Sequence, residues 1–353
     1  MGEQFNKLEV RPLEPQHMAQ VLDWYSMRKG TVMEWLLLDG AWPVHSLVAC
    51  EGETVRALLP VVQLGHPIQG ERPPMWEWGQ PLVAPGSDAR VARGWVETLA
   101  AAFLRGQDDP EGVVLTWNDT RDPVPFDGFE RLGSWSMLQG LPTAAEDGAW
   151  VMQQALPLDD AAAAFIGACA GASAWVPRRS SAYLDWRYGR APGGGHETTG
   201  VLEGGELRAL AVTGPPRWED QAEDCLGDGP STHAPCRVLP VYEFWVAEGA
   251  SRPGQALLGN LADQARAQAC ELNLALPSWQ PAFDLCVGMG MRVTPTSRDL
   301  YARPAALAPS VPRASQAWNS RALDLEALRC AWPWSLGDAH FSWCPFESSG
   351  PAD

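Results

Sequence analysis

The chain has 353 residues, 46% of them hydrophobic, and a formal net charge of −17 from 43 acidic and 26 basic residues. This length favours two domains, and the apolar content is too high for an intrinsically disordered chain. An acidic chain repels phosphate backbones and anionic membrane surfaces, so we expect neither a nucleic acid nor a membrane as partner. No apolar run approaches the roughly 20 residues of a membrane-spanning helix, because Asp39 and Gly40 interrupt the run at 35–42.

The cysteines and the N-terminal segment indicate a cytoplasmic protein without a bound metal. Eight cysteines are scattered without a Cys-x-x-Cys pair, which is typical of reduced, buried thiols. The first fifteen residues lack the apolar core of a secretory signal. Cys225, His233 and Cys236 could supply three metal ligands from one Gly/Pro-rich loop, but no fourth ligand is spaced to complete a zinc site.

A set of predicted elements occupies the first part of the chain. Strands are predicted from alternating apolar runs and helices from apolar residues at three- and four-residue steps. In chain order they are a strand and helix at 8–25, a hairpin at 49–62, an aromatic strand at 74–86, a helix at 88–106, a strand at 112–119, a helical turn within 124–135 and a strand at 136–142.

The same order of elements returns in the second part of the chain. The repeated elements are a strand and helix at 150–170, a hairpin at 201–214, an aromatic strand at 240–254, a helix at 254–272, a strand at 273–279, a helix within 281–293 and a strand at 299–304. Both hairpins contain the sequence Arg-Ala-Leu, and both aromatic strands carry a central glutamate, Glu77 and Glu243. Four similar fragments in one order indicate two copies of one α/β unit.

The element order of each copy resembles that of the GNAT superfamily of acyltransferases, and it looks closest to its tandem or Fem-like members. In such members the second copy often begins with a segment like Tyr-Leu-Asp-Trp-Arg-Tyr at 183–188. The resemblance implies an α/β (α+β) fold with two tandem GNAT-like domains, each a mixed, mostly antiparallel sheet flanked by helices. We expect a degenerate N-terminal domain at 1–145, an acyl-CoA-binding domain at 146–306, and a linker with an aromatic C-terminal extension at 307–353.

The resemblance also implies where acyl-CoA would bind. Family members hold its pyrophosphate on a glycine-containing loop between a strand and a helix, where backbone N–H groups and the helix dipole attract anions. Residues 251–256 match that pattern in part, since Gly254 and Ala256 agree with it while Ser251 stands where Gln or Arg is expected. The alternative interpretation is plain helix initiation with Pro253 in the first turn. The predicted cofactor-binding residues are Trp245, Val246, Ala247, Arg252, Gly254, Gln255 and Ala256.

The matching loop of the first copy carries Asp88, a carboxylate placed where the pyrophosphate would lie. We therefore predict no cofactor in that copy.

Three residues are candidates for catalysis by the same resemblance. Glu243 would be the general base that accepts a proton from the acceptor amine, although a solvent-facing position on an alternating strand is the alternative. Cys286 stands where the family often has a tyrosine acid, and a buried structural thiol is its alternative role. Tyr301 on the closing strand is a weaker candidate for the same acid.

Two further features stand outside these motifs. The glycine-rich segment 189–200 contains His196 and lacks the order of a nucleotide P-loop, so we interpret it as a lip with a gating role. Arg178, Arg179, Arg187 and Arg190 form a local basic cluster that could contact the CoA 3′-phosphate or an anionic substrate, or could be a solvated helix face.

These observations predict an N-acyltransferase that uses acetyl-CoA or a longer acyl-CoA as co-substrate, with no metal, and a small-molecule or peptide amine as acceptor. A non-catalytic tandem binding or scaffold protein is the alternative. Transfer from an aminoacyl-tRNA is disfavoured by the net charge of −17.

Overall fold

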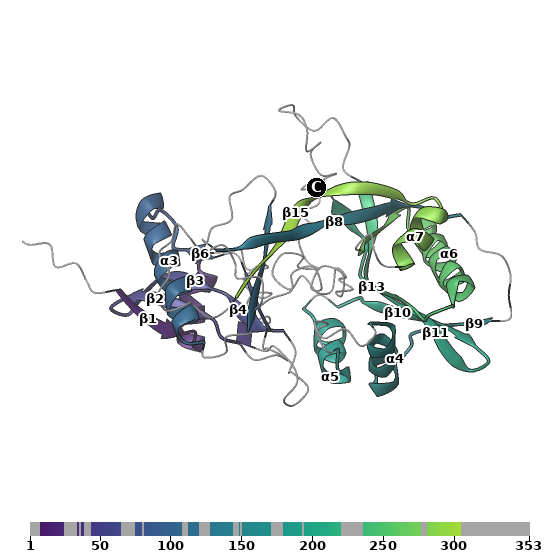
Figure 1. Cartoon of the computed structure of the whole chain (residues 1–353), viewed down its shortest axis with the longest axis horizontal. Helices are drawn as coiled ribbons and strands as arrows, with labels where there is room; N and C mark the ends of the chain where they lie inside the picture. Colours follow the sequence, from purple (N-terminus) through teal and green to yellow (C-terminus); the bar gives the residue numbers. More distant parts are fainter. Residues whose placement is uncertain are drawn as a thin grey trace, which may run out of the picture. The chain divides into compact units, whose positions relative to one another are not determined.

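The structure is a computed structural model that describes residues 8–24, 34, 37–38, 44–64, 75–79, 81–107, 112–119, 128–143, 148, 150–170, 179–192, 194–219, 236–276 and 281–304. The chain forms two compact units (Figure 1). Among the described residues, the first unit holds those up to Gly133 together with Leu300–Pro304, and the second unit holds Ser134–Asp299. Strands β8 (Glu130–Gly140) and β15 (Arg292–Pro304) therefore each contribute residues to both units.

The first unit contains two groups of paired strands and a long helix. Its elements are β1 (Leu8–Pro12), α1 (Pro15–Leu22), β2 (Leu47–Glu51), β3 (Thr54–Leu59), β4 (Val61–Gln63), β5 (Met75–Trp78), β6 (Leu82–Val83), α3 (Ala89–Arg105) and β7 (Val113–Asp119). Strands β1, β2, β3 and β6 form an antiparallel sheet in that order, while β5 pairs antiparallel with β4 and parallel with β7.

The core of the first unit lies between α3 and the strands. The apolar stripe of α3 buries Val96, Leu99 and Phe103 at helical spacing. Phe103 meets Trp76 and Trp78 of β5 edge-on, with ring centroids 5.7 and 5.5 Å away. Such aromatic contacts add directional stabilisation to the burial of large apolar side chains.

The second unit is a single mixed sheet with helices. Its remaining elements are β9 (Trp150–Gln154), α4 (Asp160–Ala170), α5 (Ser181–Leu184), the π-helical turn η1 (Asp185–Gly189), β10 (Glu197–Glu203), β11 (Glu206–Thr213), β12 (Arg217–Glu219), β13 (Cys236–Val246), α6 (Ser251–Ala267), β14 (Glu271–Leu276) and α7 (Pro281–Gly288). The strand order is β8-β14-β13-β11-β10-β9, with β12 also paired to β13. Within this order only β13 and β14 are parallel.

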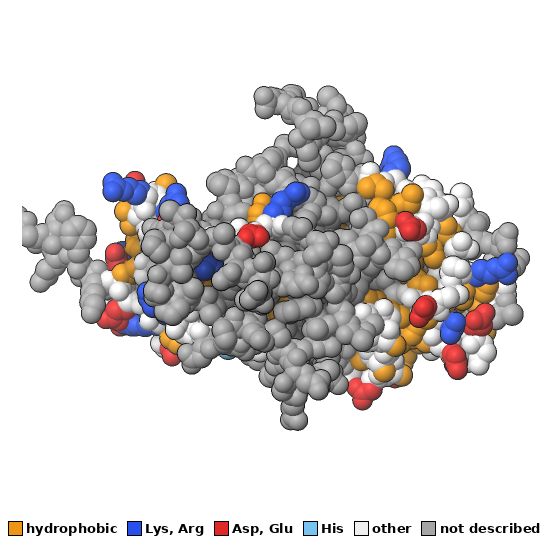
Figure 2. All heavy atoms as spheres, viewed as in Figure 1, with side chains coloured by type: hydrophobic (Ala, Val, Ile, Leu, Met, Phe, Trp, Pro, Cys, Tyr) orange, Lys and Arg blue, Asp and Glu red, His pale blue; other side chains and the backbone are white. Residues whose placement is uncertain are grey.

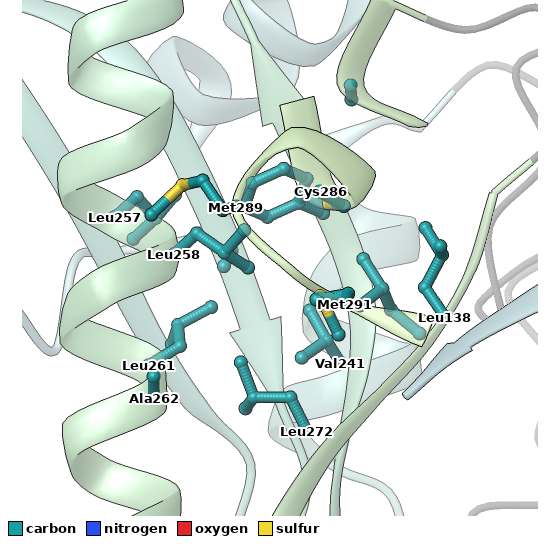
Figure 3. Close-up of a cluster of buried hydrophobic side chains, with 14 of the residues drawn as sticks. Leu138, Val241, Leu257, Leu258, Leu261, Ala262, Leu272, Cys286, Met289 and Met291 are labelled. Carbon is teal, nitrogen blue, oxygen red and sulfur yellow. The ribbon is translucent and has the colours of Figure 1, made fainter. Parts of the chain in front are cut away.

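Helices α6 and α7 cover one face of this sheet with an apolar core. Figure 3 shows Leu257, Leu258 and Leu261 of α6 directed toward Val241 and Leu272 of the sheet. Phe244 of β13 belongs to the same cluster. Because neighbouring side chains of a strand point to opposite faces, Glu243 and Trp245 lie on the other face.

The repeated order of elements is confirmed. The β2–β3 hairpin corresponds to β10–β11, α3 corresponds to α6, and the parallel pair β5–β7 corresponds to β13–β14. The predicted fold class, a mixed and mostly antiparallel α/β architecture, is also confirmed. The strand predicted at 136–142 begins earlier than expected, because β8 already starts at Glu130, and residues 121–127 lie outside the described part. The predicted domain boundaries stay predictions, and the 307–353 extension lies outside the described residues.

Candidate functional site

Strand β13 separates from β14 halfway along its length. The parallel pairing joins Val238–Val241 to Glu271–Leu274, and in the described part of β14 it goes no further. At this point β13 also bulges, because Val241 pairs with Thr213 and Glu243 with Val212, which leaves Tyr242 as the extra residue. The backbone of β13 after Val241 therefore keeps β11 as a neighbour on one side, and on the other side it has parted from β14.

Helix α6 begins at the same end of β13, after a tight turn. Gly249 has a φ of +71°, a conformation that favours glycine. The cap residue Ala250 offers no side-chain acceptor. The first N–H groups of a helix lack partners within the helix and carry its positive dipole. The first two residues of α6, Ser251 and Arg252, are both exposed.

The corresponding helix of the first unit, α3, has a side-chain cap. The Asp88 carboxylate accepts hydrogen bonds from the backbone N–H groups of Arg90 and Val91, at 2.9 and 3.2 Å. This carboxylate therefore lies at the first turn of α3, and the lack of a cofactor in the first copy stays a prediction.

The predicted cofactor-binding residues fall along this short stretch. Trp245 and Val246 end β13, Ala247 donates a backbone hydrogen bond to Arg208, and the others lie in the first two turns of α6. Gly254 is buried, and a Cβ there would lie 2.9 Å from a Leu285 methyl and 3.0 Å from both methyls of Val246. This glycine lets α6 approach β13 and α7 closely, a packing role that the motif alone did not indicate.

Glu243 is the centre of a buried polar cluster on the opposite face of the sheet. Its side chain is 0% exposed, so the solvent-facing alternative is wrong. Oε1 accepts hydrogen bonds from Arg179 Nε at 3.0 Å and from the Tyr188 hydroxyl at 2.7 Å, and Oε2 accepts one from Trp245 Nε1 at 2.7 Å. The Arg179 guanidinium also stacks over the Trp245 ring, 4.9 Å from its centroid.

This cluster depends on the segment 183–188. Ser180 caps α5 by accepting a hydrogen bond from the Tyr183 N–H, and the π-helical turn η1 follows directly. The widened turn is a feature that often accompanies functional sites, and it carries buried Arg187 and Tyr188. The expectation of a solvated basic face is therefore wrong for Arg179 and Arg187, whereas exposed Arg190 pairs with Asp185.

The Glu243 carboxylate is held in place by its buried hydrogen-bond donors. Burial, and then the charge of Glu243, raise the pKa of Tyr188 well above its ordinary value, so this tyrosine stays protonated and keeps donating. One arginine and two other donors already occupy three of the roughly four lone-pair sites of this carboxylate. The role of Glu243 as a base stays a prediction, and the geometry favours a role in positioning Tyr188 and Trp245.

The two candidate acids occupy different surroundings. Cys286 is fully buried in the apolar cluster under α6, as Figure 3 shows, and burial raises the pKa of its thiol well above the ordinary value. This position favours a packing role. Tyr301 is half-buried and belongs to the part of β15 in the first unit. Neither assignment as the acid is tested by these positions.

Two other predicted features can be placed. Glu77 of the first unit is buried like its counterpart Glu243. Within the described residues no three His, Cys, Asp or Glu side chains come together as metal ligands, while Cys225 and His233 lie outside those residues. No helix in the described part is both long and apolar enough to span a bilayer.

Comparison with known proteins identifies the fold. The sequence matches none of the family models with which it was compared, and no curated protein sequence matches it. A probable N-acyltransferase from Enterococcus faecalis aligns with a TM-score of 0.60 and 12% identity, over 85% of this chain and 72% of that one. A GCN5-related N-acetyltransferase from Anabaena variabilis gives 0.59 and 13%, over 85% and 73%.

A third similar structure was solved with an acyl-CoA bound. The N-myristoyltransferase of Saccharomyces cerevisiae with bound myristoyl-CoA aligns with a TM-score of 0.52 and 8% identity, over 86% of this chain and 80% of that one. At such identities the likeness concerns the fold. The chain has a GNAT-type fold, and the resemblance seen in the sequence is confirmed at that level.

Proposed function

We propose that the second unit binds an acyl-CoA and transfers its acyl group to an amine. The carrying observation is the parting of β13 from β14 beside the start of α6, which has no side-chain cap. The parted backbone of β13 offers hydrogen-bonding groups to an extended chain such as pantetheine. The exposed first turn of α6 offers N–H groups and a positive dipole to a pyrophosphate.

The reaction needs little from the protein beyond alignment and proton transfer. The acceptor nitrogen attacks the thioester carbonyl carbon, the C–S bond breaks, and the CoA sulfur leaves as a thiolate. The proton released by the acceptor nitrogen ends on that sulfur. In this proposal the Glu243 cluster fixes the face of β13 on which the acceptor lies, since its members are buried and mutually bonded.

The names of the similar structures support this proposal. Two are described as N-acyl- or N-acetyltransferases, and the third was solved with myristoyl-CoA. We therefore propose acetyl-CoA or a longer acyl-CoA as co-substrate in the cytoplasm, with the acyl chain to be set by experiment. Acidic and basic side chains are interspersed over the described residues of the face in Figure 2. That mixture offers no support for a tRNA-bound donor.

Calorimetric titration with acetyl-CoA and myristoyl-CoA tests the proposal. We expect Ser251→Asp to weaken binding at least tenfold, because it adds a negative charge within about 4 Å of the bound phosphates. It should leave the fold intact, since an acidic residue in the first turn of a helix is stabilising. Ser251→Asn, similar in size but uncharged, should bind normally, and so should Asp88→Asn in the first unit.

The same titration decides between the two functions. If a folded protein binds neither thioester, the non-catalytic binding or scaffold protein becomes the better interpretation. Binding that Ser251→Asp leaves unchanged would remove the cofactor from this end of α6.

A further inference from the structure

His196 lies against the Glu243 cluster and has no role in the reaction described above. Its ring is 5.4 Å from the Tyr188 ring and 5.5 Å from the Tyr242 ring, measured between centroids, and it meets both edge-on. Tyr242 is the bulge residue at which β13 parts from β14. His196 thus stands on the face of β13 where the proposed acceptor would lie.

The imidazole of His196 lies beside the Tyr188 backbone and forms no well-aligned hydrogen bond among the described residues. Both ring nitrogens are covered, and among the described residues neither meets hydrogen-bond geometry with any group. The two neighbouring hydroxyls are engaged elsewhere, because Tyr188 donates to Glu243 and Tyr242 accepts a 3.4 Å hydrogen bond from Arg217. His196 is half-buried, but its two ring nitrogens are covered and lack well-aligned hydrogen bonds, and such groups tend to have a ligand or a functional task.

The charges around His196 indicate the kind of ligand. Burial, and then the positive charge of Arg187, lower its pKa to about 4, whereas a hydrogen-bonding contact with the Tyr188 backbone, the smallest of the three causes, raises it. The other groups near the ring are the neutral Tyr188 and Tyr242, with Arg217 and Glu243 behind them. The ring is therefore neutral at physiological pH, with one N–H to donate in a field set by an arginine.

We propose that His196, with Arg187 behind it, binds a carboxylate carried by the acceptor amine. One carboxylate oxygen would accept a hydrogen bond from the ring N–H, and the positive charge of the Arg187 guanidinium would attract the carboxylate. This inference rests on the proposed acyl transfer, and it narrows the acceptor to the class of amino acids and related amino-carboxylates.

Binding requires His196 to move, and the chain provides for this movement. Gly194 and Gly195 immediately precede it, with φ of +55° and +79°. A Cβ on Gly194 would meet nothing within 4 Å, and one on Gly195 would meet only Pro215, at 3.6 Å. The backbone just before the imidazole therefore has open space where a Gly194 side chain would stand.

Three small molecules of the same carbon-chain length distinguish binding through a carboxylate from binding through an amine. In the full-length protein with isotope-labelled histidine, NMR would follow His196 during additions of 4-aminobutyrate, butyrate and butylamine. The first two carry a carboxylate and should shift the His196 resonances and raise its pKa, because an adjacent anion stabilises the charged imidazole. Butylamine has the amine alone and should do neither.

Matched variants complete the test. His196→Phe keeps the aromatic contacts and should weaken 4-aminobutyrate binding at least tenfold, whereas His45→Phe, at an exposed position in the first unit, should not change it. Acetyl-CoA titrated into the same samples separates the two proposals. If acetyl-CoA binds while no carboxylate affects His196, or butylamine affects it equally, the carboxylate site is wrong and the acyl-CoA site stands. If neither acetyl-CoA nor myristoyl-CoA binds, the proposed function falls.

Discussion

Gly254 and Gly94 provide a matched test of the packing beneath the candidate cofactor loop. Both lie near the start of a 17-residue helix: Gly254 is the fourth residue of α6, and Gly94 is the sixth residue of α3 in the other copy. A methyl group on Gly94 would meet no atom within 4 Å. Replacing it with alanine should therefore stabilise the protein by about 0.5–1 kcal/mol through helix propensity alone.

The same substitution at Gly254 should have the opposite sign. Its new methyl would lie 3.0 Å from both methyls of Val246, a side chain that is stiff at χ1, and 2.9 Å from the tip of Leu285. Overpacking of this kind costs about 1–3 kcal/mol. After the gain in helix propensity, of about 1 kcal/mol, Gly254→Ala should destabilise by up to about 2 kcal/mol.

Urea denaturation followed by circular dichroism measures both changes. A shift of the midpoint at constant slope reports the free energy of unfolding. If Gly254→Ala stabilises the protein as much as Gly94→Ala does, α6 does not approach β13 and α7 as closely as described. The outcome also matters for mutagenesis, because a bulkier residue at Gly254 would disturb the core and the cofactor loop together.

Three further predictions concern charged groups. Glu243→Gln should destabilise the protein by about 3 kcal/mol, because it removes the carboxylate that pairs with buried Arg179. The control is Glu206→Gln on the exposed hairpin turn. Equal stability of the two variants in urea would contradict the buried cluster. The free energy of unfolding should fall by up to about 3 kcal/mol as pH drops from about 6.5 to about 4, because His196 binds a proton more readily in the unfolded chain. Calorimetric scans of His196→Phe should show a flatter dependence of stability on pH. A pH dependence unchanged in this variant would show that His196 is not its cause. Asp88→Ala should lower the stability of the first unit by about 1 kcal/mol, because the helix loses its cap. Asp88→Asn keeps a capping oxygen and should lower the stability by less. Equal melting temperatures of the two variants would contradict the cap.

The sequence was informative about elements and less so about their contacts. Periodic apolar patterns predicted the hairpins, the long helices and the parallel strands in the correct order, since each pattern reflects local geometry. The strand β8 was partly missed, because a Pro-Phe-Asp-Gly sequence before it resembled a helical turn. The bulge at Tyr242 could not be predicted, because it depends on register with β11.

The sequence likewise predicted one part of the candidate site and missed another. The end of β13 and the start of α6 were recognisable from a local motif, and so was the carboxylate of Asp88. The Glu243 cluster was not, because its partners Tyr188 and Arg179 lie 55 and 64 residues away along the chain. One signal for burial was present: the Tyr-Leu-Asp-Trp-Arg-Tyr segment carries large side chains at nearly every position, which leaves little room for a solvated face.

Strand β8 has a consequence for how the two copies could have evolved and how they can be dissected. By sequence its last residues close the first copy, yet Ser136–Gly140 pair with Leu272–Leu276 of β14 in the second unit. A fragment starting after residue 147 would leave β14 with a bare, apolar edge, the kind of edge that promotes aggregation. If the two copies arose by duplication of one gene, deletion of the first would remove the strand that covers β14, so a first copy without a cofactor would still be retained.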